Sequence, residues 1–502
     1  MDINFYGAAS CVTGSCHIMR ANGKNILLDC GMFQGRDERE RGNEDFPFNP
    51  KDIDYVLLSH AHIDHSGRIP LLFKKGFGGF VITTEATYDL CNIMLQDSGH
   101  IQEMELEWKN RKRERKGLDK LDPMYTVKDA ADSLSLFRAY SYDRWIELFE
   151  GFRIRFRDAG HLLGSAIIEI IITEDGKEIK FVYTGDLGNV DIPLINDPTY
   201  IDYADYVIME TTYGDRVHKK VNNSFEELSY IIKDTMKKGG NVVIPSFAVG
   251  RTQEVLYTLN SYIEKNELKG INVYVDSPLA IESTKVFRKH TKNYDEEAKA
   301  LLKSGDNPLE FTGLNFTKTA EESAKLNKIQ SGMVVISASG MCEAGRIKHH
   351  LKHNLWRKEC AIVFVGYQAE GTLGRKILEG AKTVKIFGEE IAVNASIYNI
   401  PGLSGHADRY GLLNWIMNFK TKPKEVLLAH GDEEASKSFK ELIKSKGFNA
   451  RIMNVGEKFS TREIFKESSQ TKKEKIFRLL DSLGNIDDMD NKEIINKINE
   501  II

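Results

Sequence analysis

Cysteine is scarce in this sequence: six residues among 502, with no pair in a C-x-x-C spacing. In a chain this long, a few scattered cysteines are typical of reduced, buried thiols and not of a disulfide framework. No apolar run approaches the ~20 residues that a membrane helix needs, and the first residues lack the basic and apolar segments of a secretory signal. We therefore expect a cytoplasmic protein with no membrane segment.

An excess of positive charge is also lacking, since 69 basic and 73 acidic residues leave a formal net charge of −4. Any contact with RNA or DNA must then come from a local basic surface. The densest basic run lies at 109–116, within a pattern that predicts a helix from 85 to 148. Such a run either contacts a phosphate backbone or forms a solvated helix face, which is commoner.

The chain is too long for one ordinary core, which predicts two or three domains. Its first part is rich in predicted strands. A second block carries continuous Val/Ile runs that alternate with helical patterns, at 241–246, 273–277, 333–337 and 361–365. This alternation is typical of a parallel sheet covered on both faces. The block is therefore predicted to be a second domain inserted into the first.

Four potential metal ligands fall within six positions, directly after an apolar run at 55–58. They are His60, His62, Asp64 and His65. A buried strand that ends in such a turn can direct imidazole and carboxylate groups at one point, and zinc binds this mixture at about 2.0–2.2 Å. Because only 13 of 502 residues are histidine, three of them in six positions favour a metal site over a solvated loop. A pair of metals at this spacing suits phosphodiester hydrolysis.

Three further residues occupy positions where the same site would need them. His161 lies in a glycine-flanked loop between two predicted strands, and Asp186 ends an apolar strand, where a carboxylate can bridge two metals. Asp29 ends another strand, where an acid commonly holds a ligating histidine by its other nitrogen. Each signal alone is weak, and a plain turn is the alternative for Asp29. In series they are consistent with one metal centre.

Glu210 at a strand end, His406 after a Gly/Ser turn and His430 at a later strand end complete this series. With all these motifs in order up to about residue 456, the sequence resembles the β-CASP branch of the metallo-β-lactamase superfamily, which comprises RNA and DNA nucleases. The resemblance implies an α/β protein: a metallo-β-lactamase αββα sandwich with an inserted parallel-sheet α/β β-CASP domain. It implies sandwich segments at 1–208 and 390–456, a β-CASP domain at 209–389 and a helical extension at 457–502.

The resemblance also implies two zinc ions, although manganese is compatible with the same ligand types. One ion would be bound by His60, His62, His161 and Asp186. The other would be bound by Asp64, His65, Asp186 and His430, so that Asp186 bridges the two. The activity implied is hydrolysis of RNA to 5′-phosphate and 3′-hydroxyl ends, as an endonuclease, a 5′-exonuclease or both.

The residues expected to serve catalysis are Asp64, Asp29, Glu210 and His406. His406, polarised by Glu210, is the candidate acid that protonates the departing 3′ oxygen, and a structural or ligating role is its alternative. Ser337, Ser339 and Gly340 follow a strand and are expected to hold a substrate phosphate, where a plain turn is the alternative. Arg251 and Arg375 are candidates for gripping further phosphates.

The histidine at 430 favours RNA, because DNA-specific members of the family typically carry valine there. The alternatives are a DNA nuclease of the same superfamily, a glyoxalase-II-like thioester hydrolase and a scaffold subunit. A thioesterase needs neither the inserted domain nor Glu210 and His406, and inactive scaffolds typically lose ligands. The expected partner is single-stranded RNA in a groove between domains, with no membrane, and a homodimer is left open.

Overall fold

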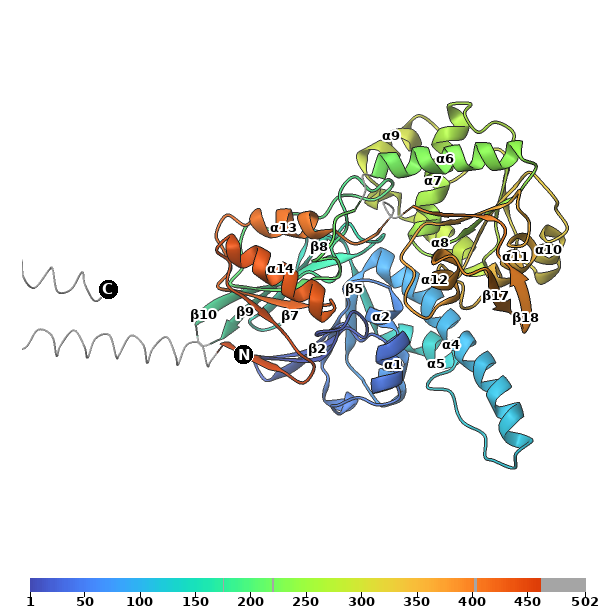
Figure 1. Cartoon of the computed structure of the whole chain (residues 1–502). Helices are drawn as coiled ribbons and strands as arrows, with labels where there is room; N and C mark the ends of the chain where they lie inside the picture. Colours follow the sequence, from blue (N-terminus) through green and yellow to red (C-terminus); the bar gives the residue numbers. More distant parts are fainter. Residues whose placement is uncertain (175, 219–220, 401–403, 462–502) are drawn as a thin grey trace, which may run out of the picture.

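The computed structural model describes residues 1–174, 176–218, 221–400 and 404–461. Figure 1 shows two lobes, one built from both ends of the described chain and the other from its middle. Among the helices of these residues, none combines the length and the apolar character that crossing a bilayer requires.

The first lobe is a sandwich of two sheets. The first sheet has the order β22-β1-β2-β3-β4-β5-β6, with β1 (Asp2–Gly7), β2 (Cys16–Ala21), β3 (Lys24–Leu28), β4 (Tyr55–Leu57), β5 (Phe80–Thr84), β6 (Phe137–Tyr140) and β22 (Lys458–Ser460). The second sheet has the order β21-β20-β11-β10-β9-β8-β7, with β7 (Trp145–Phe149), β8 (Phe152–Asp158), β9 (Ala166–Glu174), β10 (Lys177–Tyr183), β11 (Tyr206–Glu210), β20 (Glu425–Ala429) and β21 (Ala450–Ile452).

Alternation along the strands explains why these sheets pack face to face. In β9, Ile168 and Ile170 point into the core between the sheets, while Ile167 packs against helices on the outside. Both faces of the strand are therefore apolar, as a layer between two others requires. On one side of the sandwich lie α1 (Gly35–Arg41), η1 (Pro50–Asp52), α2 (Ile63–Ser66), α3 (Ile69–Lys74), α4 (Glu85–Glu114), α5 (Val127–Ser133) and η2 (Leu134–Leu136). On the other side of the sandwich lie α13 (Arg409–Met417) and α14 (Glu433–Ser445).

The second lobe is built on a sheet of order β14-β13-β15-β12-β16-β19, in which every recorded pairing is parallel. Its strands are β12 (Val242–Pro245), β13 (Asn272–Val275), β14 (Leu314–Phe316), β15 (Met333–Ser337), β16 (Ala361–Phe364) and β19 (Ser396–Asn399). Val242 and Ile244 face one helix layer and Val243 faces the other, so consecutive residues are all buried. The predicted sandwich with an inserted parallel sheet is confirmed.

Helices cover both faces of this sheet. One layer holds α6 (Val221–Lys237), α7 (Arg251–Glu264), α8 (Pro278–Lys289), η3 (Thr291–Asn293) and α9 (Glu296–Lys303). The other holds α10 (Ala320–Leu326), α11 (Ile347–Asn354) and α12 (Leu373–Leu378), beside a hairpin of β17 (Thr383–Ile386) and β18 (Glu389–Ala392).

Two segments differ from the elements that the sequence patterns predict. The helical prediction for 85–148 is wrong at 115–126, which connects α4 to α5 without a helix, and beyond η2, where β6 and β7 are strands. Ile146 of β7 is buried between the sheets, and the chain reverses into β8 through Gly151, whose φ is +73°. Residues 458–460, expected within a helical extension, form β22, because Phe459 is buried and pairs with Ile3 of β1. The rest of that extension, 462–502, lies outside the described residues.

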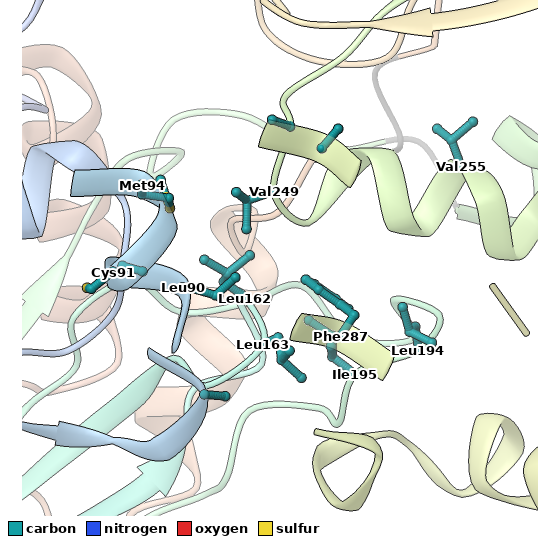
Figure 2. Packing of buried hydrophobic residues seen from close by; sticks show 14 of the residues in the cluster. Leu90, Cys91, Met94, Leu162, Leu163, Leu194, Ile195, Val249, Val255 and Phe287 are labelled. Atoms are coloured by element: carbon teal, nitrogen blue, oxygen red, sulfur yellow. The ribbon is translucent and has the colours of Figure 1, made fainter. Parts of the chain in front are cut away.

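The two lobes meet through apolar side chains beside the loop that carries His161. Leu162 follows this histidine and lies near Leu90 of α4 and Val249 of the second lobe (Figure 2). The fit is tight, since a Cβ added to Gly250 would stand 2.9 Å from the Leu162 Cδ1 atom. The loop is therefore held by both lobes at once.

Replacement of Leu162 by alanine is expected to lower the free energy of unfolding by roughly 2–5 kcal/mol, because the side chain is only 2% exposed and a cavity would remain at the junction. The first transition in urea measures this loss. Leu118→Ala is the matched control, because Leu118 is 50% exposed and its truncation should change the stability by less than about 0.5 kcal/mol. Equal losses in the two variants would show that the junction is not tightly packed.

Candidate metal centre

Parallel strands bring the predicted ligands to one edge of the sandwich. In the second sheet, β10, β11 and β20 run parallel, and Asp186, Glu210 and His430 stand at or just beyond their carboxyl ends. In the first sheet, β3 and β4 are also parallel, and they lead into Asp29 and into the turn that begins at His60. Because carboxyl ends of neighbouring parallel strands share an edge, residues from 29 to 430 converge there.

The converging side chains form two adjacent groups of potential ligands, and a third group overlaps them. In each group, ligand atoms lie within 4.8 Å of one another. The adjacent groups are His60, His62, His161 and Asp186, and Asp64, His65 and His430; the overlapping group is Asp186, Glu210 and His430. In the first, His62 Nδ1 lies 3.0 Å from His60 Nε2 and 3.1 Å from His161 Nε2. In the second, His65 Nε2 lies 2.9 Å from His430 Nε2. The structure thus brings all seven predicted ligands together.

Asp186 stands between the two groups and offers one oxygen to each. Its Oδ2 atom lies 3.4 Å from His60 Nε2 and 3.6 Å from His161 Nε2. Its Oδ1 atom lies 3.3 Å from His65 Nε2 and 3.5 Å from His430 Nε2. This Oδ1 atom is buried without a hydrogen-bond partner among the described residues. A buried carboxylate oxygen that faces imidazole nitrogens suits a shared metal ligand.

The chemistry of these groups fits divalent ions. Ligands arranged tetrahedrally at about 2.0–2.1 Å from an ion stand roughly 3.3 Å apart, close to the spacings observed here. Burial lowers the pKa of His62 to about 4 and holds the pKa values of His60 and His161 well below their usual range. These imidazoles are therefore neutral near pH 7, as metal ligands must be.

Asp29 holds His65 from behind. Its Oδ2 atom lies 2.7 Å from His65 Nδ1, so this nitrogen carries the proton and Nε2 faces the centre. The carboxylate also accepts from the Ser59 N–H at 2.7 Å and from the Tyr183 hydroxyl at 2.6 Å. Thr212 plays the matching part for the other histidine of the same group, with its Oγ1 atom 3.1 Å from His430 Nδ1.

Ser59, Tyr183 and Thr212 were not identified from the sequence. Each stands within three residues of a predicted ligand or acid, but a serine, tyrosine or threonine at a strand end is common, and nothing in the pattern marks these three.

His406 and Glu210 form a pair at the margin of the centre. His406 Nδ1 lies 3.2 and 3.3 Å from the two Glu210 carboxylate oxygens. Because a carboxylate only accepts, Nδ1 donates its proton there and Nε2 stays available. Burial lowers the pKa of His406, but the Glu210 and Asp186 carboxylates outweigh burial and raise it to about 9. The ring is imidazolium near neutral pH, and its side chain is 21% exposed.

The loop predicted to hold a phosphate is less open than its sequence suggests. Ser337 is buried, and its hydroxyl donates to the Asp276 carbonyl at 2.8 Å. Ser339 Oγ lies 3.3 Å from the Ala344 carbonyl, and Gly340 packs beside the Phe247 ring. A phosphate site here would therefore depend on Ser339 and the backbone, and it stays a prediction.

Both arginines proposed as phosphate contacts are engaged in ion pairs. Arg251 Nη1 lies 2.6 Å from Glu254 Oε2, and both side chains are buried. Arg375 Nε lies 2.6 Å from Glu379 Oε1 on the surface. Neither arginine is a free cation beside the metal centre.

Comparison with protein families gives three matches along the chain. Residues 9–230 match the metallo-beta-lactamase superfamily, 252–377 the Beta-Casp domain, and 390–453 the Zn-dependent metallo-hydrolase RNA specificity domain. The last of these segments contains His406 and the predicted ligand His430, and the first contains the other six predicted ligands.

Several curated proteins are similar over most of the chain. A ribonuclease of Thermus thermophilus is 38% identical over 452 residues, which cover 90% of this chain and 98% of that protein. An RNase J-like protein of Methanocaldococcus jannaschii is 31% identical, over 87% of this chain and 94% of that protein. Transcription termination factor FttA of the same organism is 30% identical, over 88% of this chain and 68% of that protein. A solved structure of a protein of unknown function from Enterococcus faecalis V583 shares the fold, with a TM-score of 0.51 and 13% identity over 91% of this chain and 99% of that chain.

Proposed function

Because this chain belongs to the β-CASP branch of the metallo-β-lactamase superfamily, we propose that it is a metal-dependent ribonuclease that leaves 5′-phosphate and 3′-hydroxyl ends. The family supplies the hydrolase class. The match to an RNA specificity domain and the relatives named as ribonucleases support RNA as the substrate. A role in RNA processing or decay follows from that substrate.

One observation carries the proposal: the Asp186 carboxylate stands between two ligand groups, within 3.3–3.6 Å of four imidazole nitrogens. We assign one zinc ion to the group containing His60 and the other to the group containing His65, with manganese as the alternative metal. Such a pair of ions supplies an activated water and neutralises charge on the scissile phosphate. Asp64 serves the second group, where its Oδ2 atom lies 3.6 Å from His430 Nε2.

The chain's own residues supply the proton. His406 is imidazolium near neutral pH and directs Nε2 away from Glu210, so it can donate to the departing 3′ oxygen. Glu210 also accepts from the Leu187 N–H at 2.5 Å, which fixes the carboxylate behind the ring. Asp29 keeps His65 in one tautomer throughout.

The pair of His406 and Glu210 argues against a thioester hydrolase. A thiolate leaves without a proton, so such an enzyme has no use for an imidazolium held beside its metal centre. The scaffold alternative is disfavoured for a different reason: every ligand position is filled by a histidine or aspartate. A DNA nuclease with the same machinery is separated only by experiment.

Single-stranded RNA labelled at its 5′ end tests the proposal. The purified protein is expected to cleave it in the presence of zinc or manganese, and to cleave the matching DNA at least about tenfold more slowly. Treatment with a chelator should stop the reaction because the ligand groups are emptied, and added metal should restore it. Equal cleavage after chelation, or a clear preference for DNA or for a small thioester, would contradict the proposal.

A further inference from the structure

Helix α4 is longer than the sheet that it covers. At about 1.5 Å per residue its 30 residues extend for about 45 Å. Its first half packs at the junction between the lobes, where Asp89 lies 2.7 Å from Lys289 of α8. Its second half projects from the body of the molecule (Figure 1). We call this second half, together with Arg115 and Lys116 that follow it, the arm; it begins at Ile101.

One face of the arm is covered by the chain that returns from it. The Asn110 side chain both donates to and accepts from the backbone of Leu121, at 2.9 Å each. Glu103, on the same face, accepts from the Val127 N–H at 3.2 Å. The returning segment therefore lies along this face and holds the arm as one ordered unit.

The opposite face is apolar and then basic. Ile101, Met104 and Trp108 are spaced by three and four residues, so they share a face, and they remain 44, 58 and 60% exposed. Lys112 and Arg115 continue the same row. The Lys112 ammonium lies 3.4 Å from the centroid of the Trp108 ring. A large exposed indole beside cations is an unusual combination for a surface that contacts only water.

The end of the arm carries a local excess of positive charge. Residues 109–116 hold six basic residues and one acidic residue, Glu114, which lies 3.7 Å from Lys120. In the described part of the chain, Lys112, Arg115 and Lys116 form no ion pair. The exposed row thus offers cations that no carboxylate of the described protein neutralises.

Helix α1 has links both to the arm and to the metal-binding turn. Burial raises the pKa of Glu38 in α1, and the arm residues Glu105 and Lys109 are close enough to raise it and lower it, respectively. The loop before α1 bonds the metal-binding turn directly, since the Met32 N–H donates to the Ile63 carbonyl at 2.9 Å. A strand that extended from the centre past α1 would come close to the arm.

We propose that the face of Ile101, Met104, Trp108, Lys112 and Arg115 binds single-stranded RNA outside the metal centre, an inference that rests on the proposed ribonuclease function. Aromatic platforms flanked by cations bind single strands by stacking bases and neutralising phosphates. A second copy of the chain fits this face less well. In a two-fold dimer the same patch meets itself, so the cations of both arms would enter one interface in which neither row supplies a carboxylate.

Long and short substrates separate this role from catalysis. Two variants test the face: Trp108→Ala, and separately the triple variant Lys112→Gln, Arg115→Gln and Lys116→Gln. Each is expected to lower kcat/KM about tenfold for an RNA of about 30 nucleotides. For an RNA of about 6 nucleotides kcat/KM should not change, because only the longer strand reaches the arm. The triple variant should also reduce the slope of log KM against log salt concentration by about 2. Each phosphate contact contributes about 0.7 to this slope for a single strand, and three contacts are lost.

The control replaces Lys437, Lys440 and Lys444 of α14 with glutamine, which removes the same charge elsewhere. It should leave kcat/KM unchanged for both RNAs. RNA should quench the fluorescence of Trp108 in the wild type, measured against Trp108→Phe. Unchanged kinetics on the long RNA would overturn the inference, as would equal losses on both substrates. Unchanged kinetics with a shift from dimer to monomer would assign the face to a second copy. A wild type that cuts no RNA would refute the proposed function instead, and the quenching would still test the arm.

Discussion

Asp186→Asn is expected to lower RNA cleavage by more than about a thousandfold. Residues that merely orient a metal ligand cost about 10–100-fold when removed, and Asp186 is itself shared by two ligand groups. Its oxygens face His60 and His161 on one side and His65 and His430 on the other. An amide of the same shape carries no charge and can offer only one oxygen. Both groups should therefore lose metal together.

Elemental analysis of the purified variant measures that loss, and the expected metal content is close to zero, against two ions per chain in the wild type. Asp143→Asn is the matched control, because Asp143 is 69% exposed and, among the described residues, its ion pair is with Arg157, at 3.0 Å. It should retain full metal and activity. An Asp186→Asn protein that keeps both ions, or cuts RNA within tenfold of the wild type, would show that the carboxylate does not bridge the centre.

Much of the fold follows from short-range patterns. Runs such as 241–246 are apolar at every position, and the structure places Val242 and Val243 on opposite, covered faces of a parallel sheet. The failure at 137–149 has a physical reason. A pattern of charged and apolar residues with few breakers is compatible with a helix, and only pairing of β7 with β8 makes it a strand. Tertiary contacts of that kind leave little trace in a local window.

The residues expected to bind metal could be predicted from the sequence, but the residues that orient them could not. The convergence of the residues from His60 to His430 could be predicted because histidine is rare and metal ligands recur at strand ends. Ser59, Tyr183 and Thr212 were not, because their role depends on the direction of one hydroxyl toward Asp29 or His430. Ser337 shows the converse. Its sequence context suggested a phosphate contact, but its hydroxyl is already engaged by the Asp276 carbonyl.

His406→Ala is expected to lower kcat by about 10²–10⁴-fold, the usual contribution of a general acid, while both metal ions remain bound. The reason is that His406 donates from Nδ1 to Glu210 and is absent from the ligand groups formed by the described residues. Glu210→Gln should have a smaller effect, since it lowers the pKa of His406 and moves the alkaline limb of the pH–rate profile to lower pH. His353→Ala, at an exposed histidine of α11, is the matched control.

A modified substrate distinguishes an acid from a ligand or a packing residue. When sulfur replaces the 3′ oxygen at the scissile bond, the departing thiolate needs no proton. The deficit of His406→Ala should then shrink from about 10²–10⁴-fold to within about threefold of the wild type, because the step that the imidazolium assists has been removed. A ligand role predicts the reverse: lost metal and no rescue by sulfur. Full metal with no rescue would leave His406 positioning the substrate, and the proton would have to come from another group at the centre.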